Sequence, residues 1–193
     1  KDVNEFDPPL DHPDLPSNLT TILHDIDDIR THVAGQGGEM VLSSFFWLVH
    51  DGMKLNLPRQ KTIYDYLNQT FYPHRYREME RMAAFQNRVF AKYARVNGIP
   101  YLDVAASMPR EPDLFDDAIH AKYEGVKLHA WIVAQQLAPI LLERIRGGAL
   151  PRPARLKLDR HPAFPGNERT VVFECDGNSF KVKETFNDIV ALP

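Results

Sequence analysis

Residues 40–49, MVLSSFFWLV, decide the fold that the sequence predicts. This run is short, continuous and rich in β-branched and aromatic residues, which is typical of a strand buried on both faces of a parallel sheet. A second such run, IPYLDV at residues 99–104, follows a segment with helical periodicity at residues 75–97. Strand, helix and strand in this order indicate a βαβ crossover. We therefore predict an α/β fold with a parallel sheet and helices on both of its faces.

Helices are also predicted before and after this unit. Apolar residues recur at helical spacing after Ser17, which we expect to cap a helix that ends at the glycines of residues 35–38. Another helix is expected over residues 124–137, and Pro139 should kink it or start a continuation that ends near Gly147. The predicted sheet therefore has a helix available for each face.

Residues 50–74 lack a clear period and contain one glycine and two prolines. We expect a long loop here, with one helical turn near residues 62–67, and loops of this length are usually functional or mobile. Five aromatic residues fall in or just after the segment: Tyr64, Tyr66, Phe71, Tyr72 and Tyr76. They could line a sugar or acyl site, or form a lid that packs on the sheet, and both interpretations stay open.

The C-terminal residues differ in composition from the rest of the chain. Residues 149–168 are rich in proline and basic side chains, as in a linker. Over residues 169–184, apolar and polar residues alternate on both sides of Asp176-Gly177, a strong signal for a β-hairpin. We therefore divide the chain into an α/β domain at residues 1–148 and a linker with a hairpin appendage at residues 149–193.

The composition excludes several function classes. Lys and Arg total 23 against 26 Asp and Glu, a net charge of -3, which argues against a nucleic-acid partner. No apolar run approaches the roughly 18–20 residues of a membrane span. Cys175 is the single cysteine, so zinc sites built on paired cysteines are excluded. The eight histidines are dispersed and form no HExxH pair, so we predict no metal site.

The segment that points to chemistry is Asp117-Ala-Ile-His120, in an acidic loop between the second strand and the helix that follows it. In α/β proteins the active site lies at this carboxyl end of the sheet. A carboxylate three residues before an imidazole can accept the proton on Nδ1 and leave Nε2 as a base. The spacing alone is a weak motif, and Asp116 beside it could equally be a helix cap or a solvated charge.

The order of these elements resembles the C-terminal part of the SGNH, or GDSL-type, hydrolases. The last block of that family is Asp-x-x-His followed by a glycine and an alanine-containing helix, here Asp117, His120, Gly125 and Ala130. The preceding strand, the helix containing AAFQNRVF and the strand ending in aspartate also look like the family. The resemblance covers residues 17–146 and implies a flavodoxin-like sheet and hydrolysis of a small-molecule or carbohydrate ester, with no cofactor.

The chain departs from the family in its N-terminal blocks. It contains no Gly-Asp-Ser, and Lys1-Asp2-Val3 could be only the tail of a later block. We expect that about the first third of the fold is absent from this sequence; a short, non-catalytic descendant of the family is the other explanation. The nucleophilic serine and the oxyanion donors would then lie in that absent segment, which is also a possible partner. By itself the chain would be inactive.

The serines and acids that remain are weaker candidates. Ser43 and Ser44 lie inside a predicted strand, and Ser107 lacks the sharp turn of a nucleophile. We interpret Asp103 as a cap at the end of the sheet or an anchor of the loop, rather than as a third catalytic acid. The acidic run HDIDD at residues 24–28 is interpreted as the solvated face of a helix. The alternative to an ester hydrolase is a non-catalytic SGNH-like binding or interaction domain.

Overall fold

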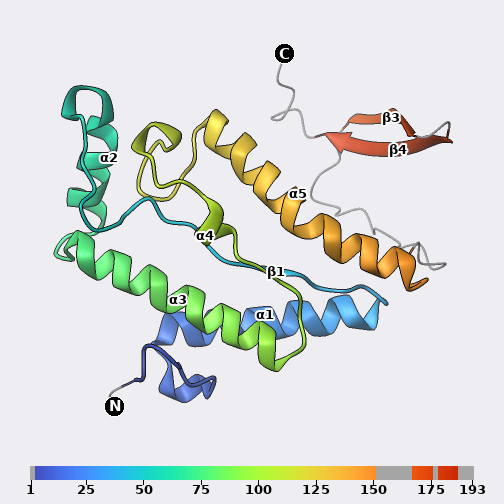
Figure 1. Ribbon diagram of the computed structural model, residues 1–193, viewed down its shortest axis with the longest axis horizontal. Helices are drawn as coiled ribbons and strands as arrows, with labels where there is room; N and C mark the ends of the chain where they lie inside the picture. Colours follow the sequence, from blue (N-terminus) through green and yellow to red (C-terminus); the bar gives the residue numbers. More distant parts are fainter. Residues whose placement is uncertain (1–2, 151–166, 176–177, 187–193) are drawn as a thin grey trace. The chain divides into compact units, whose positions relative to one another are not determined.

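The structure is a computed structural model that describes residues 3–150, 167–175 and 178–186. The chain divides into two compact units, residues 1–153 and residues 154–193, which are described separately. The first unit is an α/β fold, mostly helical, with a small parallel sheet between its helices (Figure 1). Its short elements are 3-10 helices η1 (His12–Asp14) and η2 (Pro112–Leu114) and helix α4 (Val104–Ser107).

The sheet of the first unit consists of two parallel strands, β1 (Leu42–Ser43) and β2 (Tyr101–Leu102). Leu42 pairs with Tyr101 and Ser43 pairs with Leu102, so the predicted parallel pairing is confirmed. The predicted length is wrong, because the ladder stops after Ser43 although the apolar run continues to residue 49. Beyond the ladder, a side chain makes the hydrogen bonds of the Phe45 backbone. Asn87 accepts from the Phe45 N–H at 2.9 Å and donates to the Phe45 carbonyl at 2.8 Å.

Three long helices lie where their periodicity predicts them: α1 (Ser17–Gly35), α3 (Tyr76–Val96) and α5 (Tyr123–Arg146). Ser17 does not cap α1 as expected; it is the first helical residue, and Pro16 occupies the cap position. Pro139 neither ends nor restarts α5, which runs through it. Because Pro139 is exposed, water can satisfy the carbonyl that its missing N–H leaves free.

The long loop expected over residues 50–74 is wrong for most of its length. Residues Leu57–Thr70 form helix α2, which begins with a proline in its first turn. The helix is kinked at Gln60, whose backbone has φ -118° and ψ 27°. The Gln60 side chain accepts from the Asn56 N–H at 2.7 Å and donates to Asp113 at 2.9 Å. This glutamine therefore joins α2 to η2, directly before the Asp-x-x-His loop.

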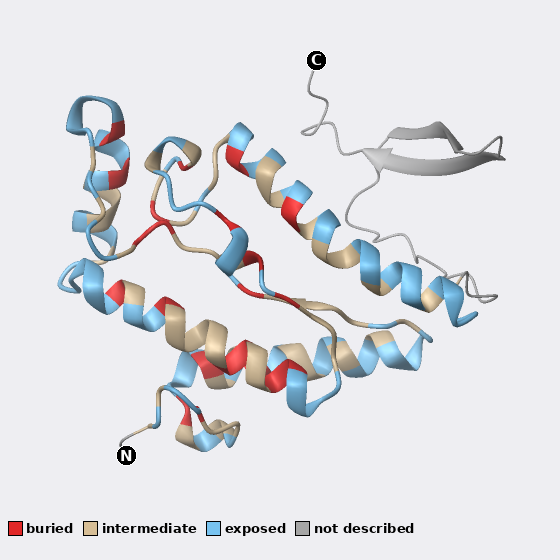
Figure 2. Ribbon diagram, in the orientation of Figure 1, coloured by how far each residue is buried: buried red, intermediate tan, exposed pale blue. Residues whose placement is uncertain are grey.

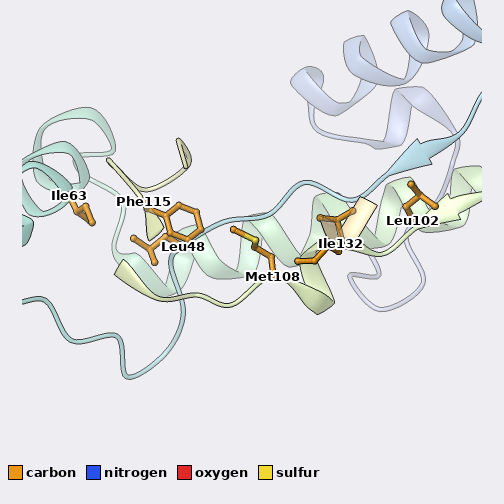
Figure 3. Packing of buried hydrophobic residues seen from close by; sticks show 7 residues of the cluster. Leu48, Ile63, Leu102, Met108, Phe115 and Ile132 are labelled. Carbon is orange, nitrogen blue, oxygen red and sulfur yellow. The ribbon is translucent and has the colours of Figure 1, made fainter. Parts of the chain in front are cut away.

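The helices cover the two faces of the sheet. Leu42 and Tyr101, which are paired, pack against the cluster formed by α1 and α3, whereas Leu102 packs with Ile132 of α5. Figure 2 shows the buried residues along the central segments and on the inner sides of the helices. The cluster on the α5 side also contains Leu48, Ile63, Val104, Met108 and Phe115 (Figure 3). The loop that carries Asp117 thus starts from a core residue.

The second unit contains two antiparallel strands, β3 (Asn167–Cys175) and β4 (Asn178–Phe186). Their register pairs Val171 with Val182 and Phe173 with Phe180. The predicted turn residues Asp176 and Gly177 lie outside the described residues. Among the helices that the structure describes, none has the length and apolar character needed to cross a bilayer.

Candidate functional site

The loop between η2 and α5 is closed by its own backbone. Phe115 and Ala121 form an isolated antiparallel bridge, and the Asp116 N–H donates to the His120 carbonyl at 2.8 Å. One residue further out, the Lys122 N–H donates to the Leu114 carbonyl at 2.9 Å. These backbone interactions close a five-residue loop, residues 116–120, at its base and restrict the directions of its side chains.

The loop is also fastened to the core. Phe115 and Ala118 have no exposed surface, and the Leu48 N–H donates to the Ala118 carbonyl at 3.0 Å. Leu48 belongs to the apolar run that continues from β1, so the segment after this strand is hydrogen-bonded to the loop. The backbone around Asp117 and His120 is therefore held both by hydrogen bonds within the loop and by contacts with the core.

Asp117 uses both carboxylate oxygens within this loop. Its Oδ1 accepts from the backbone N–H groups of Ile119 and His120, each at 2.8 Å. Its Oδ2 lies 2.7 Å from Nδ1 of the His120 ring. The first pair of bonds forms a side-chain turn of the kind that Asp favours, and the second bond orients the imidazole. The sequence motif is thus a joined pair in the structure.

Burial and hydrogen bonding act in opposite directions on Asp117. Desolvation by burial raises the pKa of this carboxyl, but the hydrogen bonds from Ile119, from the His120 ring and from the His120 N–H outweigh it, so its pKa lies below the ordinary value. The Asp117 side chain is 14% exposed, whereas the His120 side chain is 69% exposed. With Nδ1 bonded to a carboxylate, Nε2 is the ring atom available to a substrate or nucleophile.

The depressed pKa of Asp117 predicts a specific pH dependence of stability. A carboxyl of this kind stabilises the fold above its unfolded pKa, and the contribution is lost as the pH falls through the lower folded value. Asp117→Asn should therefore be less stable than wild type at neutral pH, and the gap should narrow as the pH falls below 3.8. Urea unfolding from pH 7 to pH 3 measures this difference. Asp116→Asn, an exposed neighbour, should follow wild type; a constant gap for Asp117→Asn would contradict the expectation.

The serines considered from the sequence do not complete the site. Ser44 is buried, donates to Asp103 at 3.3 Å and accepts from the Ala105 N–H at 2.8 Å. Ser43 donates to the Ser44 carbonyl, and Ser107 accepts from Gln136. Asp103 is the N-cap of α4, accepting from the Ala106 N–H, which confirms its interpretation as a cap. These hydrogen bonds do not connect any of the three serines to His120.

The aromatic residues after β1 gather around a hollow of about 900 Å³. Tyr64, Phe71, Tyr72 and Tyr76 line it, whereas Tyr66 packs against Phe71, with the ring centroids 5.5 Å apart. Three aliphatic residues, Met53, Leu55 and Leu57, also line the hollow, and their recurrence at every second position is a signal visible in the sequence. In the acidic run, Asp25 and Asp28 are exposed, as predicted for a solvated face, whereas Asp27 is half-buried, accepts from the Tyr93 hydroxyl and pairs with Arg30.

Within the described part of the chain, no group of three His, Cys, Asp or Glu side chains could hold a metal ion. Comparison with protein-family models, with curated proteins and with solved structures gives no match in any of the three. The geometry of the loop and of the hollow is therefore the basis for assigning a function.

Proposed function

We propose that this chain is part of an ester hydrolase of the SGNH type, in which His120 is the general base and Asp117 orients it. The observation that carries the proposal is the contact of 2.7 Å between Asp117 Oδ2 and His120 Nδ1, in a loop fastened to the core. A carboxylate on Nδ1 fixes the tautomer in which Nε2 is unprotonated. The exposed ring then presents a base to solvent.

The reaction would follow the serine-hydrolase route. His120 Nε2 takes the proton of a serine hydroxyl as the oxygen attacks the ester carbonyl. The resulting imidazolium gives its proton to the departing alcohol when the ester bond breaks. Water then attacks the acyl-enzyme, with His120 again accepting and returning the proton, and releases the acid and the serine. The serine and the oxyanion donors would come from a segment outside these 193 residues.

Two features of the fold support this proposal. The Asp-x-x-His loop follows the carboxyl end of β2, where ligands bind in open parallel sheets. Four apolar side chains of α5, Trp131, Leu141, Leu142 and Ile145, are between 41% and 62% exposed. A further segment that extends the sheet to a flavodoxin-like order would cover such a face. The strands β3 and β4 would form a hairpin appendage that adds no catalytic group. The substrate would be a small-molecule or carbohydrate ester.

A second candidate is a non-catalytic binding domain that retains the SGNH-like loop. The hollow of about 900 Å³ favours this candidate, because it offers a binding site without requiring a nucleophile. The two candidates differ in one respect that can be measured, which is the presence of an activated serine.

Labelling with a fluorophosphonate distinguishes them. The coding DNA upstream of Lys1 should encode an in-frame Gly-Asp-Ser, and the longer protein should be labelled on that one serine. Ser44→Ala should be labelled to the wild-type extent, because Ser44 is buried and bonded to Asp103. A longer protein that is folded but unlabelled, or a reading frame without such a segment, would favour the binding domain.

A further inference from the structure

The hollow has an apolar floor. It is lined by the segment before α2, by α2 itself, by the turn that follows and by the first turn of α3 (Figure 1). The lining residues that are buried or half-buried are all apolar: Met53, Leu55, Leu67, Phe71 and Met79. Small-molecule sites combine a floor of this kind with a few placed polar groups. The polar groups at the rim therefore decide which ligand suits this hollow.

The rim of the hollow is basic. Arg75 and Arg77 line it, and the described lining residues include no carboxylate. Arg77 is already engaged, since its Nε lies 3.3 Å from Asp51 Oδ1. The Arg75 N–H donates to Glu78 Oε2 at 2.7 Å, but within the described part of the chain no group is bonded to the Arg75 guanidinium. One guanidinium at the rim is therefore left for a ligand.

Two tyrosine hydroxyls at the hollow are also left for a ligand. Tyr64 is 46% exposed and Tyr72 is 80% exposed, and among the described residues none is hydrogen-bonded to either hydroxyl. The Tyr76 hydroxyl, in contrast, donates to Asp51 at 3.0 Å. A tyrosine hydroxyl can donate to a carboxylate oxygen while its ring packs against an apolar or aromatic group. These side chains suit a ligand that has a polar end and an apolar body.

A ligand that uses the whole lining must be both charged and apolar. A purely aliphatic chain would cover the floor and leave the Arg75 guanidinium unused, whereas a small inorganic anion would contact the guanidinium and leave the floor uncovered. The planar guanidinium binds a carboxylate through two parallel N–H bonds. The single guanidinium that is left for a ligand matches one negative charge, which favours a carboxylate over a doubly charged phosphate.

We propose that this hollow binds a small carboxylate with an aromatic body. Arg75 would hold the carboxylate, and the rings of Tyr64, Phe71 and Tyr72 would contact the aromatic body, a kind of contact that adds to the affinity from area burial. The hollow of about 900 Å³ has room for such a molecule. The inference is independent of the proposed hydrolase, because the described residues that line the hollow include neither Asp117 nor His120.

Three ligands test the charge and the apolar body separately: 4-phenylbutanoate, its neutral amide 4-phenylbutanamide, and acetate. Ligand-observed NMR with the 193-residue chain measures their affinities. The carboxylate should bind about fivefold or more tightly than the amide, because a charge-assisted hydrogen bond persists at a partly exposed site although solvent weakens it. Raising the salt concentration should reduce this preference. Acetate should show no saturable binding, since it does not reach the floor.

Variants assign the preference to one side chain. Arg75→Gln should bind the carboxylate no more tightly than the amide and should keep the wild-type affinity for the amide. Arg95→Gln is the matched control, because Arg95 is exposed in the last turn of the same helix and does not line the hollow; it should keep the wild-type preference. Tyr64→Ala should weaken both ligands about threefold or more. Circular dichroism checks that each variant is folded.

Three outcomes would overturn the inference. The first is equal affinity of the wild-type chain for 4-phenylbutanoate and its amide. The second is the same loss of preference in Arg95→Gln as in Arg75→Gln. The third is the absence of saturable 4-phenylbutanoate binding at roughly 10 mM, which exceeds the millimolar dissociation constant expected for a ligand of this size. None of these outcomes depends on cleavage of an ester, so they leave the proposed hydrolase to its own test.

Discussion

His120→Ala in the longer protein is expected to lower the turnover of p-nitrophenyl acetate by about 10³-fold or more, with the fold intact. In the proposed mechanism, this variant removes the base that takes the serine proton and the acid that gives it to the departing alcohol. The His120 side chain is 69% exposed, and its removal leaves both backbone bonds to Asp117 Oδ1 in place. Turnover per folded protein, with the thermal unfolding midpoint as a check on folding, measures the effect.

Two further variants test whether that loss of turnover comes specifically from the Asp-x-x-His loop. Asp117→Asn should lower turnover less than His120→Ala, because the base survives while the tautomer is no longer fixed. His32→Ala, an exposed histidine on α1, should leave turnover unchanged. Wild-type rates in His120→Ala would refute the assignment of the base. Equal losses in His32→Ala would show that the effect is not specific to the loop.

Gly125→Ala should cost about 2–3 kcal/mol of the free energy of unfolding, because it forces a methyl group into filled space. Gly125 is buried in the first turn of α5, and a Cβ there would lie 2.3 Å from the Leu114 carbonyl oxygen. The same methyl would lie 3.0 Å from the Cβ of Ala121. The Leu114 carbonyl accepts from the Lys122 N–H, so relief of the clash must move the base of the Asp-x-x-His loop. Urea unfolding monitored by circular dichroism measures the loss.

The matched control for that variant is Gly35→Ala at the last residue of α1. No atom lies within 4 Å of a Cβ built there, so alanine should be neutral or stabilising by up to about 1 kcal/mol. The contrast separates crowding from the general preference of helices for alanine. A Gly125→Ala protein as stable as wild type, with unchanged esterase activity, would contradict this prediction. It would show that the loop moves to accommodate the methyl group with little loss of stability.

Helix α3 could be predicted from sequence because it buries one regular stripe. In α3, the buried residues Met79, Ala83, Phe90 and Ala94 recur three or four positions apart or at multiples of that spacing. Helix α2 was expected only as a single turn, because one of its two buried residues, Gln60, is polar and interrupts the apolar pattern. Pro58 suggests a loop when it is considered alone, yet proline is well placed in a first helical turn.

The length of the strands was not predictable from the sequence, because a strand extends only as far as a neighbouring strand pairs with it. The run at residues 40–49 has the composition of a strand, but β2 offers it only two paired residues. Beyond them, Asn87 and Ala118 provide hydrogen bonds that no local pattern reveals. In the site, the spacing of Asp117 and His120 predicted their contact, since it is local. The hollow was not predictable as a shape, because it is formed by side chains from separate elements.

The two roles of the Asp117 carboxylate limit which replacements at this position preserve the loop. One oxygen holds the turn of the loop and the other holds the imidazole, so most replacements remove both at once. Asparagine, serine and threonine can still accept from backbone N–H groups two or three residues ahead, and they spare the turn while releasing the ring. A substitution at this position that keeps the turn of the loop and releases the His120 ring is therefore restricted to a few residue types.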